Sequence, residues 1–392
     1  MREAVIVAYG RSAIGRSPRG TLKDTRPEDF TAQVIKGVLA KVPTFDPALI
    51  DDVILGCAFQ EAETGSNVAR NIVLLAGLPV SVPAQTINRF CSSGLQSIAM
   101  GANAILAGQA DVVLAGGVET MSMIPMGGNV NAPAASLATG MPEALTAMGH
   151  TAEIVAEQYG VSREAQDEFA YNSQIRAMAA QDAGKFVDEI IPVDAVKIKT
   201  DDAGNVVQYT EKFDKDEGMR RGIVMEDLQK LKAVFKKGGA VTAGNASQMN
   251  DGASVVLLME KEKAKALGLT PIAKFLSYSV VGCEPATMGM GPVYAIPKAL
   301  QMAGVKKEDI DVWEINEAFA AQAVACVNEL GLQNANVNPN GGGIALGHPL
   351  GCTGAVLTCK LLSELKRTGK KYGVVSMCIG GGMGAAGVFE MC

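Results

Sequence analysis

Histidine is scarce in this chain of 392 residues, which contains only His150 and His348. Imidazole is the commonest general base near neutral pH, so a base of that kind has two candidate positions. Charged residues make up 19% of the sequence, the net charge is −6, and there is no long basic run, which argues against a nucleic-acid-binding protein. The hydrophobic share of 48% is enough for a large buried core, in two ordinary domains or one duplicated one.

None of the eight cysteines forms a C-x-x-C pair, so no metal site is expected. A chain of this size does not need disulfides, and reduced thiols favour a cytoplasmic protein. The N-terminus leads at once into the apolar segment Ala4 to Tyr9, which predicts a first strand and not a secretory leader. Six cysteines are interpreted as small buried residues, whereas Cys91 and Cys378 lie beside glycines and are candidates for chemistry.

Two stretches, Phe90 to Ala110 and Gln333 to Cys359, contain no Asp, Glu, Lys or Arg. Their length alone would allow membrane spans. Both are rich in Gly, Ser, Asn or Thr, and ordinary polar sequence follows each of them, so we expect no membrane association. We predict instead two helices buried on all sides, over Leu95 to Leu106 and Ala355 to Leu365.

These stretches occupy equivalent places in an internal repeat with an offset of 260 residues. The offset aligns Ile50-Asp51 with Ile310-Asp311, Ala58-Phe59 with Ala318-Phe319, and Ser93-Gly94 with Thr353-Gly354. Each half has the pattern strand, amphipathic helix, strand, buried helix, strand. The pattern predicts a duplicated α/β fold with mixed sheets.

A region of different composition separates the two halves. It contains a charged stretch and an amphipathic helix predicted from Ser162 to Ala183, with Ser162 as the N-cap. We therefore assign residues 1–119 with 251–268 to an N-terminal half, 120–250 to an inserted loop domain, and 269–392 to a C-terminal half.

Cys91 stands at the predicted start of a buried helix. The partial positive charge of a helix N-terminus favours the thiolate, which is a strong nucleophile toward thioesters. The alternative is a buried cysteine packed at a strand–helix junction.

His348 lies in a glycine-rich loop, before Pro349, where helical packing does not explain it; it is either a general base or a structural histidine. Cys378 follows a β-like run and precedes three glycines, whose free N–H groups can hold an oxyanion. It is either an acid and base or a strand-end cysteine. One imidazole and two thiols of this kind indicate acyl transfer.

Two further polar residues are candidates. Asn316 ends a predicted strand and could orient a water or polarise a carbonyl, or else cap the next helix. Ser247 could hydrogen-bond an amide of an extended ligand, or else belong to a turn. Gly116-Gly117 lacks the spacing of a dinucleotide-binding loop or a P-loop.

Taken together, these segments resemble the thiolases, over essentially the whole chain. The motifs that carry the resemblance are Asn88-Arg-Phe-Cys-Ser-Ser-Gly94, Gly116-Gly-Val-Glu-Thr-Met-Ser122, Asn316-Glu-Ala-Phe-Ala320, Gly347-His-Pro-Leu-Gly351 and Cys378-Ile-Gly-Gly-Gly-Met-Gly384. The resemblance implies two α/β halves stacked as five layers (αβαβα) with an inserted loop domain.

The resemblance also implies a two-step reaction. Cys91, activated by His348, attacks the keto carbonyl of a 3-ketoacyl-CoA, Cys378 protonates the acetyl-CoA enolate that leaves, and free CoA takes the acyl group from Cys91. The reverse reaction is a condensation of two thioesters. One oxyanion hole is expected from His348 and a water held by Asn316, and another from the N–H groups of Cys91 and Gly380.

Binding residues follow from the same resemblance. Arg220 matches an arginine near the adenine and phosphates of CoA, Ala243 and Ser247 match the pantetheine-contacting segment, and Met148 and Met288 match methionines of the acyl pocket. Both methionines could also be core residues. CoA is expected as a cosubstrate, with no permanently bound cofactor. His150 is predicted to lie in a loop beside Met148.

Some positions bear on the branch of the family. Short-chain biosynthetic members usually have histidine where this chain has Met126 and Ala147, so we favour a 3-ketoacyl-CoA thiolase of broader chain length. The alternative is a short-chain acetyl-CoA C-acetyltransferase; more remote ones are a ketoacyl-synthase-like condensing enzyme and a non-catalytic acyl-CoA carrier. The family is usually dimeric or tetrameric, and we expect a homo-oligomer, favouring a tetramer.

Overall fold

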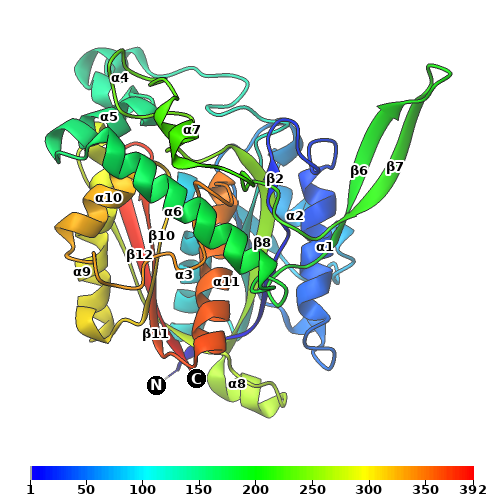
Figure 1. Cartoon of the computed structure of the whole chain (residues 1–392). Helices are drawn as coiled ribbons and strands as arrows, with labels where there is room; N and C mark the ends of the chain where they lie inside the picture. Colours follow the sequence, from blue (N-terminus) through cyan, green and yellow to red (C-terminus); the bar gives the residue numbers. More distant parts are fainter. Residues whose placement is uncertain (1) are drawn as a thin grey trace.

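The computed structural model describes residues 2–392 and is built around one ten-stranded sheet (Figure 1). Its strands are β1 (Ala4–Arg11), β2 (Gly15–Arg16), β3 (Asp52–Gly56), β4 (Ala84–Ile87), β5 (Val112–Thr120), β8 (Asn250–Glu260), β9 (Ala273–Gly282), β10 (Val312–Ile315), β11 (Tyr372–Ile379) and β12 (Met383–Met391). The order β10-β11-β12-β9 continues into β1-β8-β5-β3-β4, while β2 pairs with β8. Because β9 and β1 pair over two residues each, the sheet consists of two sets of strands with a narrow connection.

Helices cover the two sets of strands and fill the space between them. They are α1 (Pro27–Leu39), α2 (Val68–Leu75), α3 (Ser93–Leu106), α9 (Gly291–Ala303), α10 (Ala320–Glu329) and α11 (Leu350–Thr368). The pair α3 and α11 lies in the middle, α1 and α2 cover the N-terminal set, and α9 and α10 lie outside the C-terminal set (Figure 1). The predicted five-layer α/β fold is therefore confirmed.

The predicted buried helices are α3 and α11; burial on all sides holds for α11 over residues 355–362 but not for α3, where Asn103 and Leu106 are exposed. Their apolar side chains, including Leu95, Ile98 and Leu361, are fully buried in one core cluster between the strands. Within residues 2–392, no helix combines the length and the apolar character needed to cross a membrane.

Glycines at the first turns let α3 and α11 approach closely. A Cβ on Gly94 would lie 2.8 Å from the backbone nitrogen of Ala355, and one on Gly354 would lie 2.3 Å from that of Leu95. Real Cβ contacts are not this short, so a side chain at either position would force the backbones apart. The close contact brings the segments that precede the two helices to the same end of the molecule.

The internal repeat is visible in single hydrogen bonds. The Asp51 carboxylate accepts the backbone N–H groups of residues 111 and 112, at 2.7 and 2.9 Å. Asp311, 260 positions later, accepts those of residues 371 and 372, at 2.9 and 3.0 Å. Each aspartate joins the start of one parallel strand to its neighbour, so the sequence offset corresponds to a structural duplication.

The segment between β5 and β8 lies over the strand ends (Figure 1). It contains α4 (Ala135–Gly140), α5 (Met148–Gln158), α6 (Arg163–Asp182), the hairpin β6 (Val193–Thr200) with β7 (Val206–Phe213), and α7 (Met225–Gln229). Ser162 caps α6 as predicted, since its side chain accepts the N–H of Ala165. The helix was expected to bury an apolar face. Its buried positions are instead held by Ala, Ser, Gln and Asp.

Short elements complete the chain. Helix α8 (Lys261–Ala266) follows β8. Single 3₁₀ turns cover Pro47–Leu49, Ala62–Thr64, Phe90–Ser92, Pro142–Leu145, Pro285–Met290 and Lys307–Asp309.

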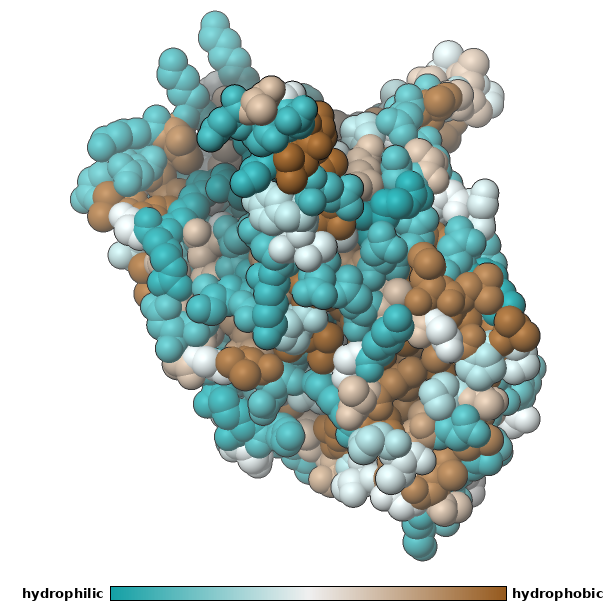
Figure 2. Space-filling model, turned by 90° about the vertical axis from the view of Figure 1, so that its right-hand side faces the viewer, coloured by the Kyte–Doolittle hydropathy of each residue, from teal (hydrophilic) through white to brown (hydrophobic). Residues whose placement is uncertain are grey.

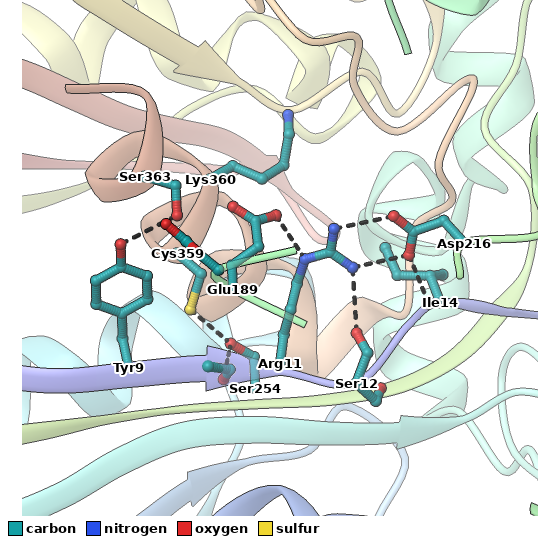
Figure 3. A network of polar contacts seen from close by, with 12 residues as sticks. Tyr9, Arg11, Ser12, Ile14, Glu189, Asp216, Ser254, Cys359, Lys360 and Ser363 are labelled. Carbon is teal, nitrogen blue, oxygen red and sulfur yellow. Dashed lines mark hydrogen bonds and ion pairs between the residues drawn. The ribbon is translucent and has the colours of Figure 1, made fainter. Parts of the chain in front are cut away.

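A buried arginine fastens the intervening segment to the sheet (Figure 3). Arg11, the last residue of β1, donates to Glu189 at 2.8 Å and to both oxygens of Asp216 at 2.7 and 2.9 Å. None of the three side chains is more than 1% exposed. Loss of one partner would leave a buried charge uncompensated, so the network fixes this attachment.

Candidate active site

A cavity of about 540 Å³ opens where the segment between β5 and β8 meets the strand ends. It gathers eight of the predicted residues: Cys91, Met148, Arg220, Ala243, Ser247, Met288, His348 and Cys378. Asn316 and Gly380 do not line it but contact residues that do. The three groups proposed for chemistry therefore converge, although 257 positions separate the first in the chain from the second.

Cys91 lies in the 3₁₀ turn before α3 and is 2% exposed. Burial raises the pKa of its thiol to about 11, although the N–H groups of Gly380 and of Cys91 itself act on the sulfur and lower the pKa. The N–H groups thus favour the thiolate, as expected of the helix start, but the thiol is the stable form in the resting site. Loss of hydration outweighs the helix end and the two N–H groups.

The side chain of His348 is held at both ring nitrogens. Nδ1 lies 2.6 Å from the Thr353 hydroxyl, and Nε2 lies 3.2 Å from the amide nitrogen of Asn316. Thr353 donates its single proton to the carbonyl of Pro349 at 2.9 Å, so it accepts from Nδ1–H. This network assigns the proton to Nδ1 and leaves a lone pair on Nε2.

Two further features set the state of His348. Burial lowers the pKa of the imidazole to about 4, so the ring is neutral at neutral pH. Its backbone N–H donates to Asn250 at 3.0 Å, and a Cβ on Gly347 would lie 2.3 Å from Cγ of the same asparagine. The glycine before the histidine is thus required by close approach, and a neutral ring whose unprotonated Nε2 accepts only the Asn316 amide can act as a base.

Asn316 follows β10 directly and is fully buried. Its amide nitrogen faces His348, whereas its Oδ1 has no hydrogen-bond partner among residues 2–392. Helix capping does not explain it, because the N-cap of α10 is Phe319. The neighbouring Glu317 instead accepts from Ser173 at 2.6 Å and Asn338 at 2.8 Å, and fixes the chain locally.

Cys378, the second-last residue of β11, is 1% exposed and packs with Met288 and Ala318. Burial raises the pKa of its thiol well above the ordinary value, and the nearby Cys91 raises it further. Both sulfurs are therefore protonated at neutral pH. Three and four residues after Cys378, Gly381 and Gly382 have φ of 82° and 88° and form the turn to β12, which leaves the Gly380 N–H directed at Cys91.

The polar end of the cavity carries Arg220 and Ser247. Arg220 donates to the carbonyl of Ala243 at 2.7 Å, and its pKa is lowered by burial and by the nearby Arg16, which also lines the cavity. Ser247 is held by its N–H to the carbonyl of Ala318, at 2.9 Å. Two guanidinium groups beside one opening provide local positive charge in an acidic protein, which suits an anionic ligand.

Much of the rest of the lining is apolar. Met148, the first residue of α5, and Met288 belong to it together with Phe235 and Phe319. His150 belongs to the first turn of α5, not to a loop as predicted, and its ring meets Phe235 edge-on at 5.9 Å. Two residues that position the site, Thr353 and Asn250, were not identified from the sequence, where Thr353 appeared only as a member of the repeat.

Known proteins resemble this chain over nearly its whole length. The family model "Thiolase, N-terminal domain" matches residues 4–262, and "Thiolase, C-terminal domain" matches residues 269–391. The chain is 51% identical to a 3-ketoacyl-CoA thiolase of Bacillus subtilis, with all of both chains covered. It is 49% identical to peroxisomal 3-ketoacyl-CoA thiolase A of Mus musculus, over 98% of this chain and 90% of the other.

Solved structures give the same result. The crystal structure of Bacillus anthracis acetyl-CoA acetyltransferase has a TM-score of 0.88 and 42% identity, and covers 100% of this chain and 99% of the other. Human mitochondrial 3-ketoacyl-CoA thiolase has a TM-score of 0.89 and 40% identity, with the same coverage.

Proposed function

Since the chain belongs to the thiolase family, we propose that its cavity cleaves 3-ketoacyl-CoA with CoA, and catalyses the reverse condensation, through an acyl group on Cys91. The protein is an acyltransferase. One observation carries the assignment of the chemistry to residues: Cys91, His348 and Cys378 line one cavity.

The first step uses the protonation states described above. His348 takes the Cys91 proton on its unprotonated Nε2, which gives up the Asn316 N–H as it does so, and the sulfur attacks the keto carbonyl. The carbon–carbon bond then breaks, the acyl group stays on sulfur, and the Cys378 thiol gives its proton to the α-carbon of the departing acetyl-CoA. A buried thiol that remains protonated at neutral pH suits this acid.

In the second step the thiol of free CoA attacks the acyl group on Cys91. Its proton goes to the Cys378 thiolate, and the protonated His348 returns a proton to the Cys91 sulfur as that sulfur leaves. The enzyme is restored with atoms and charge balanced. CoA is thus a cosubstrate, and we assign no permanently bound cofactor to the reaction.

Charge develops on two oxygens, first on the thioester oxygen of the acetyl-CoA enolate as it departs and second on the former keto oxygen each time a sulfur attacks its carbon, so two oxyanion holes are needed. We assign the first to His348, whose Nε2–H becomes a donor after protonation, and to a water held by Asn316; the unpaired buried Oδ1 of that residue supports this role. The second is assigned to the N–H groups of Cys91 and Gly380, both of which act on the Cys91 sulfur.

Substrate binding follows the two ends of the cavity. We assign the phosphates of CoA to Arg220, its pantetheine arm to Ala243 and Ser247, and the acyl chain to the wall of Met148 and Met288. The 3-ketoacyl-CoA thiolase branch is favoured, since Met126 and Ala147 line the cavity as apolar residues. A short-chain acetyl-CoA C-acetyltransferase is the second candidate, favoured by the similarity to the Bacillus anthracis structure.

We also propose a homo-oligomer, a dimer or tetramer. Strand β4 ends the sheet order with an unpaired edge, and the nearby large apolar residues Leu74, Leu75 and Val80 are 47%, 51% and 79% exposed. Figure 2 shows apolar areas on the face that carries the N-terminal helices.

A cytoplasmic setting is supported by the eight cysteines, all of them free thiols.

The test is the absorbance of the Mg²⁺–acetoacetyl-CoA complex, followed after addition of free CoA. We expect a CoA-dependent loss of signal that Cys91→Ser abolishes. Cys378→Ser should still become acylated on Cys91 but should not condense two thioesters. Equal loss of both steps in Cys378→Ser would reassign that residue, and activity confined to four-carbon substrates would favour the acetyltransferase.

A further inference from the structure

Glu119 is a buried carboxylate beside the cavity that the proposed reaction does not use. It is the second-last residue of β5 and 1% exposed. Its Oε2 accepts the backbone N–H of Ala58 at 2.8 Å and that of Gly351 at 2.7 Å, and its Oε1 accepts that of Phe59 at 3.4 Å. Over residues 2–392, no lysine, arginine or histidine lies within ion-pair distance of it.

One of its hydrogen bonds leads to the turn of Cys91. The carbonyl of Ala58 accepts the amide of Asn88 at 2.9 Å, and the side-chain oxygen of Asn88 accepts the N–H of Phe90 at 2.7 Å. Phe90 has φ of 43° and directly precedes Cys91. A non-glycine residue in this region needs support from its surroundings, and the bond from Asn88 supplies it.

The other hydrogen bond leads to His348. Gly351 lies in the first turn of α11, three residues after the histidine. A Cβ on this glycine would lie 2.6 Å from Cα of Cys57 and 2.8 Å from Oε2 of Glu119, so the two segments meet with no room for a side chain. A single carboxylate therefore joins the segment before α3 to the segment before α11.

The internal repeat shows what is special about this position. With an offset of 260, Gly351 corresponds to Cys91, and Glu119 corresponds to Ile379. In the second half the strand end leaves the N–H of the following Gly380 directed at Cys91. In the first half the Glu119 carboxylate occupies the equivalent strand end. It accepts the N–H of Gly351, the residue that corresponds to Cys91.

We propose that Glu119 is a positioning residue, which sets the separation of Cys91 and His348 by accepting the N–H groups of Ala58 and Gly351. This inference rests on the proposed function. A displacement of about 1 Å between reacting groups can lower a rate about 100-fold.

The essential property of Glu119 is that its Oε2 accepts two hydrogen bonds. The negative charge of the side chain is not required. Burial raises the pKa of Glu119 to about 7, so the group takes up a proton in the neutral range. A proton on Oε1 can be donated to the Cys57 sulfur, which lies 3.6 Å away, and leaves Oε2 free to accept both short bonds. Glu119→Gln keeps an acceptor in that place, Glu119→Asp keeps the charge but shortens the reach, and Glu119→Ala removes both.

The experiment measures kcat and KM for thiolysis in the full-length variants, with active sites counted by alkylation of Cys91. We expect Glu119→Ala and Glu119→Asp to lower kcat about 10- to 100-fold with KM for CoA changed less than about threefold. Glu119→Gln should stay within about threefold of the wild type in kcat. Glu119→Asp decides the matter if the alanine variant does not fold.

Asp311→Ala is the matched control, since it also removes an acceptor of two backbone N–H groups. Asp311 precedes β10, whereas Asn316 of the site follows the other end of that strand. It should lower the melting temperature and leave kcat per active site unchanged. The proposal is overturned if folded Glu119→Asp keeps the wild-type kcat, or if Glu119→Gln loses as much as Glu119→Asp. An inactive wild-type protein would instead refute the proposed function, and this inference with it.

Discussion

The orientation of His348 depends on one hydroxyl group, and Thr353→Val tests that dependence. Valine has nearly the shape of threonine, so the packing at the start of α11 is retained. The substitution removes the oxygen that lies 2.6 Å from Nδ1 of His348. It leaves a buried N–H without a partner and removes the preference for the proton to sit on Nδ1.

The size of the effect follows from this unpaired group. A buried donor left without its acceptor costs about 1–3 kcal/mol. If this cost lowers the population of His348 rings whose Nε2 is unprotonated, kcat should fall about 5- to 150-fold. KM for CoA should change little, because Thr353 does not line the cavity.

Thr358→Val is the control for the helix itself. Thr358 is fully buried one turn and a residue further along α11 and donates to the carbonyl of Gly354 at 2.8 Å, as Thr353 donates to Pro349. Both variants lose a hydrogen bond to the preceding turn, but only Thr353→Val loses a contact with the imidazole. Nitrogen NMR of the imidazole ring gives the tautomer directly. Assignment is simple because His150 is the only other histidine in the chain.

The measurements are steady-state thiolysis and the ring nitrogen shifts of both variants. Thr353→Val should show a mixture of tautomers together with the lower kcat, while Thr358→Val should match the wild type in both. A Thr353→Val enzyme with wild-type kcat, or a wild-type spectrum with the proton on Nε2, would refute the reasoning.

Two more predictions concern the thiol and the CoA end of the cavity. The pKa of Cys91 is about 11, so alkylation of this residue by iodoacetamide, located by mass spectrometry, should accelerate about tenfold per pH unit across the neutral range and level off only near pH 11; a plateau below pH 8 would contradict the burial argument. Arg220→Ala should raise KM for CoA about tenfold while leaving that for pantetheine, which has no phosphates, unchanged. The control is Arg221→Ala, because the Arg221 guanidinium pairs with Asp182 at 2.7 Å outside the cavity. An equal rise in KM for CoA and for pantetheine in Arg220→Ala would argue against a phosphate contact.

Much of the fold was predictable because its signals are local or periodic. The offset of 260 predicted a duplicated fold, and the equivalent hydrogen bonds of Asp51 and Asp311 bear it out. The uncharged stretches predicted the central helices. The buried face of α6 was less predictable, because alanine, serine and glutamine pack there by size and hydrogen bonding, which hydrophobic periodicity does not detect.

The candidate site divides in the same way. Cys91, His348 and Cys378 were identified from their glycine-rich surroundings and motifs, and the structure places them on one cavity. The protonation of the Cys91 thiol was not predictable, because burial depends on residues distant in the chain. Thr353 and Asn250 lacked a signal, since a threonine or asparagine that holds a neighbour looks like any other.

The sequence by itself determined which chemical groups are present and that two similar halves carry them, because motifs and repeats are properties of the chain order. Only the tertiary structure decided the protonation of the thiols, the tautomer of His348 and the joining of the two active-site segments by Glu119. Those properties depend on exclusion of water and on hydrogen bonds such as that between Glu119 and Gly351, whose partners lie 232 positions apart. Contacts of that kind exist only after the chain has folded.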